Sequence, residues 1–161
     1  MKNLFVIFSM FLLSCSSTIE DKKSVPEWTK DAIMYEVNVR QYTPEGTFES
    51  FSKHLPRIKD LGVDIIWFMP IHPIGEKNRK GSLGSYYSVK DYKSINPEFG
   101  TLEEFNALVK KIHDMDMKVI IDWVANHTAF DNVWVEEGNY DWYTLDSLGH
   151  LQPPIGTDWW D

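Results

Sequence analysis

Hydrophobic residues follow two different periods along the chain. Short apolar runs at residues 33–39, 63–70 and 118–124 predict β-strands, and the middle run is almost wholly apolar, as in a parallel strand covered on both faces. Between these runs, apolar residues recur every three or four positions and predict two amphipathic helices. The order strand, helix, strand, helix, strand predicts an α/β fold with a parallel sheet.

Both predicted helices carry recognisable boundary residues. Thr47 is a suitable N-cap for the first helix, Gly62 is placed to end it, and Pro56 predicts a kink within it. Residues 101–104, Thr-Leu-Glu-Glu, form a capping box at the start of the second helix. The expected buried positions are Phe48, Phe51, Leu55, Ile58 and Leu61 in the first helix, and Leu102, Phe105, Leu108, Val109, Ile112 and Met115 in the second.

The first residues are predicted to be a secretion signal rather than part of a domain. Lys2 precedes residues 4–13, which are apolar except for Ser9. This stretch is shorter than the roughly 20 apolar residues that span a bilayer, but it has the length of a signal-peptide core. Residues 12–15, Leu-Leu-Ser-Cys, resemble the lipobox of bacterial lipoproteins, in which the cysteine receives the lipid. The alternative is an ordinary cleaved signal with an incidental cysteine.

The lipobox resemblance implies a location and a membrane contact. We expect residues 1–14 to be a lipoprotein signal peptide and residues 15–27, which are polar, to be a tether. Cys15 would then anchor the protein through lipid to a membrane of the bacterial cell envelope, either on its periplasmic face or at the cell surface.

Composition excludes some classes of function. The 161 residues carry a net charge of −8 without a basic stripe, which argues against nucleic acid as a partner. A single cysteine excludes an internal disulfide and a cysteine-based zinc site. Aromatic residues make up 14% of the chain, which suits either a large core or a surface that stacks on sugar rings.

Candidate chemistry follows the second and third predicted strands. In parallel α/β folds, ligands bind at the loops after the carboxyl ends of the strands. The loop at residues 72–100 is long enough to suggest function, and residues 122–128 place a carboxylate, an amide and an imidazole at a strand end. No glycine-rich phosphate loop follows any strand, which disfavours nucleotide binding. From these features alone, a barrel and an open doubly wound sheet both remain possible.

Residues 122–128, Asp-Trp-Val-Ala-Asn-His-Thr, resemble the first conserved motif of the α-amylase family, glycoside hydrolase family 13. Residues 33–37 and 61–70 resemble the first two strands of that family. The segments at 87–92 and 95–101 resemble its tyrosine-bearing loop and the entry to its second helix. The resemblance implies a (β/α)₈ TIM barrel, of which this chain would contain the first three strands.

This resemblance also implies a domain organisation. Residues 28–128 would be part of the catalytic barrel, and residues 129–161 would begin the loop domain that the family inserts after its third strand. A barrel of this kind has eight strands and typically about 250 residues, so we expect the fold to be incomplete in this chain.

Four residues receive roles from the resemblance. Tyr87 would stack on the sugar at the cleavage site, and His127 would hydrogen-bond a hydroxyl of that sugar. Asp122 would order the end of the third strand, and Asn126 would be a ligand in those members that bind calcium. The alternatives are that Tyr87 packs in the core and that His127 is a structural histidine.

The activity implied is that of a retaining glycoside hydrolase acting on α-glucans such as starch and maltooligosaccharides. Retaining enzymes use two carboxylates, one as nucleophile and one as acid and base. In the family these follow the fourth and fifth strands, with a third aspartate after the seventh, so we expect no catalytic residue within this chain. The alternatives are an α-glucan transglycosylase or branching enzyme, or a non-catalytic starch-binding lipoprotein of the envelope.

We therefore expect these 161 residues to be a fragment of a longer enzyme. Expressed alone, they should be insoluble or molten and without activity, because three strands leave an apolar face and an open sheet edge uncovered. Calorimetry of the isolated chain should show no cooperative transition. A sharp melting transition would contradict this prediction.

Overall fold

The computed structural model describes residues 25–160. The chain divides into two compact units, Met1–Lys30 and Asp31–Asp161, and the described part of the first contains the short 3₁₀ helix η1 (Glu27–Thr29). The predicted signal peptide, Cys15 and most of the predicted tether lie outside the described residues. Within residues 25–160, no helix has the length and apolar character needed to cross a bilayer.

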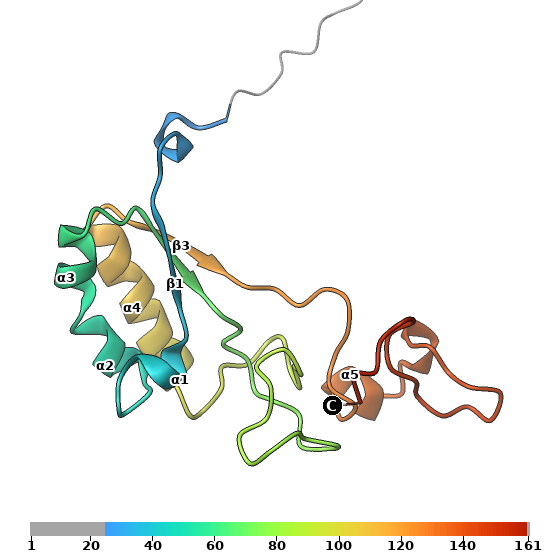
Figure 1. Cartoon of the computed structure of the whole chain (residues 1–161). Helices are drawn as coiled ribbons and strands as arrows, with labels where there is room; N and C mark the ends of the chain where they lie inside the picture. The colour runs from blue at the N-terminus through green and yellow to red at the C-terminus, as the bar shows by residue number, and fades with distance from the viewer. Residues whose placement is uncertain (1–24, 161) are drawn as a thin grey trace, which may run out of the picture. The chain divides into compact units, whose positions relative to one another are not determined.

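The second unit is built on a three-stranded parallel sheet (Figure 1). The strands are β1 (Met34–Val37), β2 (Ile65–Phe68) and β3 (Lys118–Ile121), and β2 lies between the other two. Parallel pairing requires a crossover connection between β1 and β2 and another between β2 and β3. The predicted α/β fold, with its parallel sheet, is therefore confirmed.

The strands end level with one another, which positions the segments that follow them. Val37 pairs with Phe68, and Phe68 pairs with Ile121. One residue further on, the Met69 N–H donates to the Val37 carbonyl at 3.0 Å, and the Asp122 N–H donates to the Phe68 carbonyl at 2.8 Å. The main chain of Asp122 is thus held directly at the carboxyl edge of the sheet.

The predicted strands were too long at their carboxyl ends. Val39 begins the helix α1 (Val39–Tyr42) instead of ending a strand. Pro70 has no N–H with which to extend the ladder from β2. After Asp122, no further backbone bond joins the chain to β2 among the described residues, so β3 ends before the predicted boundary at Val124.

The first predicted helix is two helices, α2 (Phe48–Ser52) and α3 (Leu55–Asp60). Pro56 lies in the first turn of α3, where a missing N–H has no cost, so the predicted kink is a complete break. The predicted N-cap is confirmed, because the Thr47 hydroxyl accepts the Ser50 N–H at 3.2 Å. Gly62 follows α3 with a φ of +83°, a conformation that favours glycine.

The second predicted helix is α4 (Leu102–Asp114), and its capping box is confirmed. The Glu104 N–H donates to the Thr101 hydroxyl at 3.2 Å, and the Thr101 N–H donates to the Glu104 carboxylate at 2.7 Å. Two backbone donors that the helix leaves unpaired are thereby satisfied.

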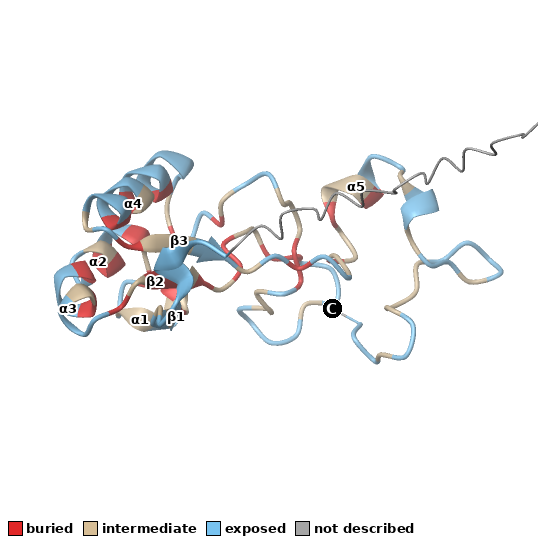
Figure 2. Cartoon of the chain, turned by 90° about the horizontal axis from the view of Figure 1, so that it is seen from above, coloured by how far each residue is buried: buried red, intermediate tan, exposed pale blue. Residues whose placement is uncertain are grey.

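Helices α2, α3 and α4 turn their apolar sides to the sheet and enclose the core, seen as buried positions between them in Figure 2. Leu61 and Leu102 were predicted in this core but are exposed, because they lie at helix ends and face solvent. The core consists of Val37, Val39, Phe48, Phe51, Leu55, Ile58, Val63, Ile66, Phe68, Ile71, Phe99, Phe105, Leu108, Ile112 and Met117.

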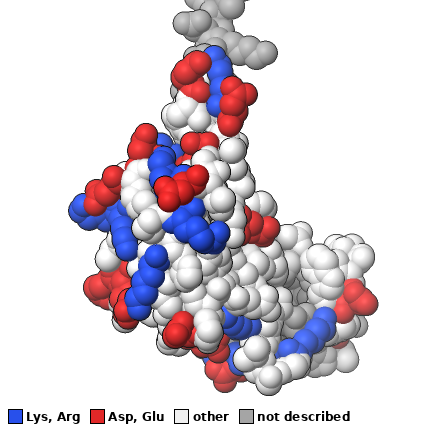
Figure 3. All heavy atoms as spheres, turned by 60° about the vertical axis from the view of Figure 1, so that its left-hand side comes forward, with Lys and Arg blue, Asp and Glu red and all other residues white. Residues whose placement is uncertain are grey.

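The two faces of the sheet differ. On the helical side, basic and acidic side chains are interspersed over the surface in view in Figure 3. The β2 residues Ile65, Ile66 and Phe68 are buried, as predicted for a central strand. The helices pack against the face of the sheet that carries Phe68. On the strands on either side of β2, Met34 and Ile120 are 48% and 40% exposed.

Long loops extend from the carboxyl edge of the sheet. The loop after β2 folds back on itself through an antiparallel bridge between Ile74 and Val89. The segment after β3 contains the helix α5 (Val133–Glu136) and the 3₁₀ helix η2 (Tyr140–Trp142). A second antiparallel bridge, between Leu145 and Leu151, closes the turn that follows.

The capping box yields a test of stability. Thr101→Ala should lower the free energy of unfolding by about 1 kcal/mol, because one N-terminal N–H of α4 loses its acceptor. Thr101→Ser keeps the hydroxyl and should stay within a few tenths of a kcal/mol of the unsubstituted protein. Urea denaturation of the protein expressed from its complete reading frame measures both, and equal losses would contradict the capping role.

Candidate functional site

Tyr87 and Asp122 meet where the loop after β2 crosses the end of β3. The Tyr87 hydroxyl donates to Oδ2 of Asp122 at 3.0 Å. Because the Asp122 main chain is hydrogen-bonded to β2, this contact holds the Tyr87 side chain near the carboxyl edge of the sheet. Tyr87 is 37% exposed and is not part of the core, so the residue is partly accessible to solvent.

The same loop holds the segment that carries His127. The Tyr92 hydroxyl lies 2.5 Å from the Val124 carbonyl and 2.8 Å from the His127 carbonyl, and so joins both ends of a short stretch of main chain. The Tyr92 ring also stacks on Trp134, with centroids 5.2 Å apart and an interplanar angle of 19°. Burial raises the pKa of Tyr92 to about 12, so its hydroxyl stays protonated as a donor near neutral pH.

Close backbone packing brings the two loops together. A Cβ added to Gly75 would lie 2.4 Å from the Ala129 Cβ, so only glycine allows this approach. The fully buried Asn132 donates from Nδ2 to the Val89 carbonyl at 2.9 Å. The Ala129 N–H donates to that same carbonyl at 3.0 Å, which fixes the Tyr87 loop against the chain after β3.

An ion pair reinforces this junction. The Lys90 ammonium lies 3.4 Å from Asp131 and 3.5 Å from Glu76, and the Glu76 N–H donates to Asp131 at 2.9 Å. Burial alone would raise the pKa of Asp131, but the Glu76 N–H and the Lys90 charge lower it below its ordinary value. Asp131 is therefore ionised near neutral pH and bridges the two loops.

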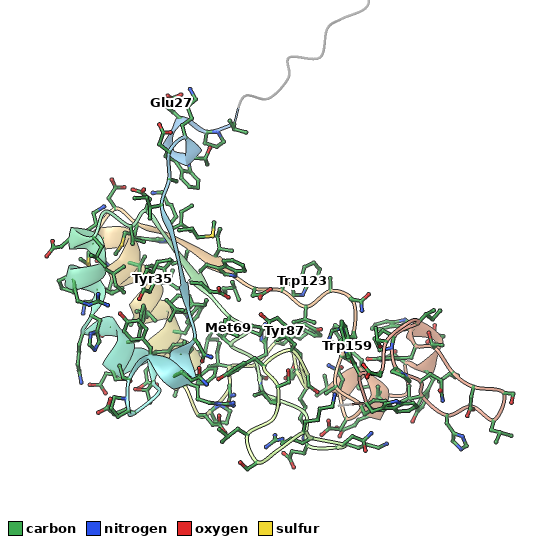
Figure 4. All side chains as sticks on the ribbon, viewed as in Figure 1. Glu27, Tyr35, Met69, Tyr87, Trp123 and Trp159 are labelled. Atoms are coloured by element: carbon green, nitrogen blue, oxygen red, sulfur yellow. The ribbon has the colours of Figure 1, made fainter. Side chains whose placement is uncertain are left out.

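Tyr87 and His127 line one cavity of about 340 Å³, here named the Tyr87 cavity. Figure 4 shows Tyr87 and Trp159 beyond the strand ends, approaching from different segments. No Asp or Glu lines this cavity among the described residues. Its walls are formed by Lys80, Ser85, Tyr87, Ser88, His127 and Trp159.

The predicted site residues take different places. Tyr87, His127 and Asp122 are brought together at the sheet edge, whereas Cys15 lies outside the described residues. Asn126 is exposed, and its Nδ2 lies 3.3 Å from Nδ1 of His127.

Calcium requires six to eight oxygen ligands. Within residues 25–160, His, Asp and Glu side chains nowhere gather in groups of three or more that could bind a metal ion. Calcium at Asn126 therefore stays a prediction.

Two further residues at the site, Lys80 and Tyr92, were missed from the sequence, and Trp159 was one of several aromatic residues after the third strand that could line a sugar site, none of which was singled out. Trp159 packs on His127 with ring centroids 5.1 Å apart, and Lys80 lines the Tyr87 cavity. Tyr92 positions the main chain of His127. Neither Trp159 nor Lys80 belongs to a local pattern, and only the fold brings them to the cavity. For Tyr92, the only indication in the sequence was its position in the same loop as Tyr87.

Comparison with known proteins identifies a matching family and several relatives. Residues 16–156 match the family model for the α-amylase catalytic domain. Over 128 residues the chain is 34% identical to probable oligo-1,6-glucosidase 3 of Bacillus subtilis, and over 131 residues it is 36% identical to a trehalose synthase of Thermus thermophilus. These alignments cover 72% and 73% of this chain but 22% and 13% of the two relatives. The chain thus spans about a fifth or less of their length.

A solved structure agrees with this match. An α-amylase from Lactobacillus plantarum superposes with a TM-score of 0.76 at 48% identity, covering 79% of this chain and 30% of that one. The fold class predicted from the sequence is therefore confirmed, and β1, β2 and β3 are strands of a TIM barrel.

The contact between Tyr87 and Asp122 can be tested by titration. Loss of hydration and the neighbouring carboxylate raise the pKa of Tyr87 from 10.0 to about 12. Asp122→Asn should lower this pKa, because the negative charge that opposes the tyrosinate is removed. The difference in ultraviolet tyrosinate absorbance between each protein and its own Tyr87→Phe variant isolates this residue. An unchanged or higher pKa in Asp122→Asn would contradict the contact.

The same shift predicts how stability depends on pH. A pKa raised by folding favours the protonated phenol in the folded state, so this contribution is fully present below about pH 10 and is lost as the pH rises through about 12. Tyr87→Phe should show a smaller alkaline loss of unfolding free energy than the unsubstituted protein.

Proposed function

Since this chain belongs to the α-amylase family, we propose that it supplies the glucan-holding part of an enzyme that cleaves or transfers α-glucosidic bonds. The observation that carries the proposal is the Tyr87 cavity, in which two loops bring Tyr87 and His127 to one place. This cavity lies at the carboxyl edge of the strands, where TIM barrels place their active sites.

Five of the six wall residues of the Tyr87 cavity have a role in this proposal. The Tyr87 ring stacks on the apolar face of a glucose unit, and the hydrogen bond to Asp122 fixes the orientation of the ring. The His127 imidazole exchanges a hydrogen bond with a sugar hydroxyl. Lys80, Ser85 and Ser88 offer further donors to hydroxyls around the ring.

Bond cleavage needs carboxylates that this cavity lacks. A retaining mechanism uses a nucleophile and an acid/base group about 5 Å apart. We propose that both come from residues other than those of this chain, and that the 161 residues alone are inactive.

Two types of reaction are compatible with this proposal, hydrolysis and transfer to a sugar acceptor. Hydrolysis is the leading proposal, and transfer to a sugar acceptor is the alternative, since the relatives include both an oligo-1,6-glucosidase and a trehalose synthase. A starch-binding lipoprotein would keep the cavity and lack the carboxylates. The complete reading frame distinguishes an enzyme from the binding protein. For an enzyme, we expect the frame to encode an Asp, a Glu and an Asp after successive barrel strands. A frame without them would contradict the enzyme and leave the binding protein.

Sugar binding tests the roles of the wall residues. In the protein expressed from its complete reading frame, Tyr87→Ala should weaken maltotriose binding about tenfold, because the stacking surface is lost. Tyr87→Phe keeps the ring and should weaken binding less. His127→Ala should weaken binding roughly twofold to tenfold through loss of a hydrogen bond.

Calorimetric titration with a thio-linked maltotriose avoids hydrolysis during that measurement. The matched control is Tyr140→Ala, since Tyr140 is exposed and does not line the Tyr87 cavity. Equal affinities in the Tyr87→Ala and Tyr140→Ala variants would contradict the proposal.

We also propose that the protein is anchored in the bacterial cell envelope through lipid on Cys15, and that Asn126 is one ligand of a calcium ion whose other ligands lie elsewhere. The lipobox resemblance of residues 12–15 supports the first proposal. The resemblance of residues 122–128 supports the second.

The lipid anchor has a direct test. Cys15→Ala should abolish incorporation of labelled palmitate and move the protein from the membrane fraction to the aqueous fraction, because the thiol that receives the lipid is missing. Ser17→Ala is the matched control and should change neither readout. Labelling that persists in Cys15→Ala would overturn this prediction.

A further inference from the structure

Arg40 is a mostly buried cation beyond the carboxyl end of β1. It lies in α1, directly after the buried Val39, and only 14% of its side chain is exposed. A guanidinium is planar and carries several N–H donors in a fixed geometry, so it can hold several groups at once. Here it contacts a carboxylate, two backbone carbonyls and an aromatic ring.

The guanidinium holds the part of the loop after β2 that leads into Tyr87. Arg40 donates from Nη2 to the Leu83 carbonyl at 3.3 Å and from Nη1 to the Gly84 carbonyl at 3.5 Å. Its guanidinium carbon lies 4.5 Å from the centre of the Tyr86 ring, which is a cation–π contact. The Tyr86 ring also packs against the core. The main chain just before Tyr87 is thus tied both to Arg40 and to the core.

The position of Arg40 is itself fixed from the entry to α4. Arg40 Nη2 lies 2.9 Å from the Glu98 carboxylate, and the Glu98 N–H donates to Oδ1 of the buried Asn96 at 3.0 Å. Since 48% of the Glu98 side chain is exposed, water screens this ion pair, and its main effect is to orient the guanidinium. Arg40 therefore joins three segments that are distant in the sequence.

The chain that follows Tyr87 is held by other contacts. The Ser88 carbonyl accepts the Gly75 N–H at 2.9 Å, and the Val89 carbonyl accepts the Ala129 N–H at 3.0 Å. Tyr87 thus lies between two fixed stretches of one loop. Arg40 holds the first stretch, and the junction with the segment after β3 holds the second.

We propose that Arg40 is a positioning residue, which sets the place of the Tyr87 ring in the Tyr87 cavity by fixing residues 83–86. Arg40 is not among the described wall residues of this cavity, so it acts through Tyr87 and not by contact with a sugar. This inference rests on the proposed function and extends it to a residue outside the cavity.

The pKa of Tyr87 reports on this placement in the absence of sugar. Burial and then the Asp122 carboxylate raise it to about 12. In the protein expressed from its complete reading frame, Arg40→Ala should lower this pKa toward its ordinary value of 10.0, because a loosened ring regains water and moves away from the carboxylate. Loss of the Arg40 charge alone would act the other way, since a nearby cation favours tyrosinate. The tyrosinate absorbance of each protein, minus that of its own Tyr87→Phe variant, measures this pKa.

Calorimetric titration with thio-linked maltotriose measures the effect on binding. Arg40→Ala should weaken binding about fivefold, less than Tyr87→Ala, because the ring remains but is less often in place. In the Tyr87→Ala background, the same substitution should change the affinity by less than about twofold, since no ring is left to position. Lys110→Ala is the matched control, because it removes the cation of an ion pair on α4, and it should change neither the pKa nor the affinity.

The outcomes separate the inference from the proposed function. If the pKa of Tyr87 stays unchanged or rises in Arg40→Ala, or if binding weakens equally with and without the Tyr87 ring, the inference fails. If the pKa falls but the unsubstituted protein binds no maltotriose, Arg40 positions Tyr87 and the proposed function fails.

A second variant covers the case in which Arg40→Ala does not fold. Arg40→Lys keeps the charge but not the planar set of donors, so it should still lower the pKa of Tyr87. An unchanged pKa in Arg40→Lys would then overturn the inference.

Discussion

The parallel pairing of β2 with both of its neighbours is the constraint on which the remaining structure depends. Because all three strands run the same way, their carboxyl ends lie at one edge, and the loops after β2 and β3 begin side by side. The backbone bond from Asp122 to Phe68 continues this pairing by one residue. It places the first polar side chain after β3 where the Tyr87 hydroxyl reaches it.

The loops keep this arrangement through contacts of their own. Loops of such length ordinarily move, but here they are joined by the close approach at Gly75, by the buried Asn132 and by the bridging carboxylate of Asp131. Unpaired polar atoms in a protein interior are costly, so a network that satisfies most of them holds the loops firmly. Tyr87 and His127 lie on the two segments that this junction joins, and both line the Tyr87 cavity.

The faces of the sheet differ chemically from the strand ends. The helical face of the sheet is closed by a packed core, while the opposite face and the open edge of β3 carry partly exposed apolar groups such as Met34 and Ile120. The Tyr87 cavity lies beyond the strand ends, and no carboxylate is among its wall residues in the part of the chain that the structure describes. Such walls suit holding a sugar chain, whereas breaking its bonds requires charged groups from elsewhere in a barrel.

Much of this could be predicted from the sequence, because local rules govern it. Apolar periodicity and the capping residues Thr47 and Thr101 depend on neighbours within a few positions, and they predicted the order of elements and the helix starts. The candidate pair of Tyr87 and His127 came instead from the resemblance of residues 87–92 and 122–128 to the α-amylase family. Strand lengths, the exposure of Leu102 and the placement of Trp159 were decided only by the tertiary structure. The physical reason is that ladder pairing, burial and cavity walls depend on segments that are distant in sequence and meet only when the sheet has formed.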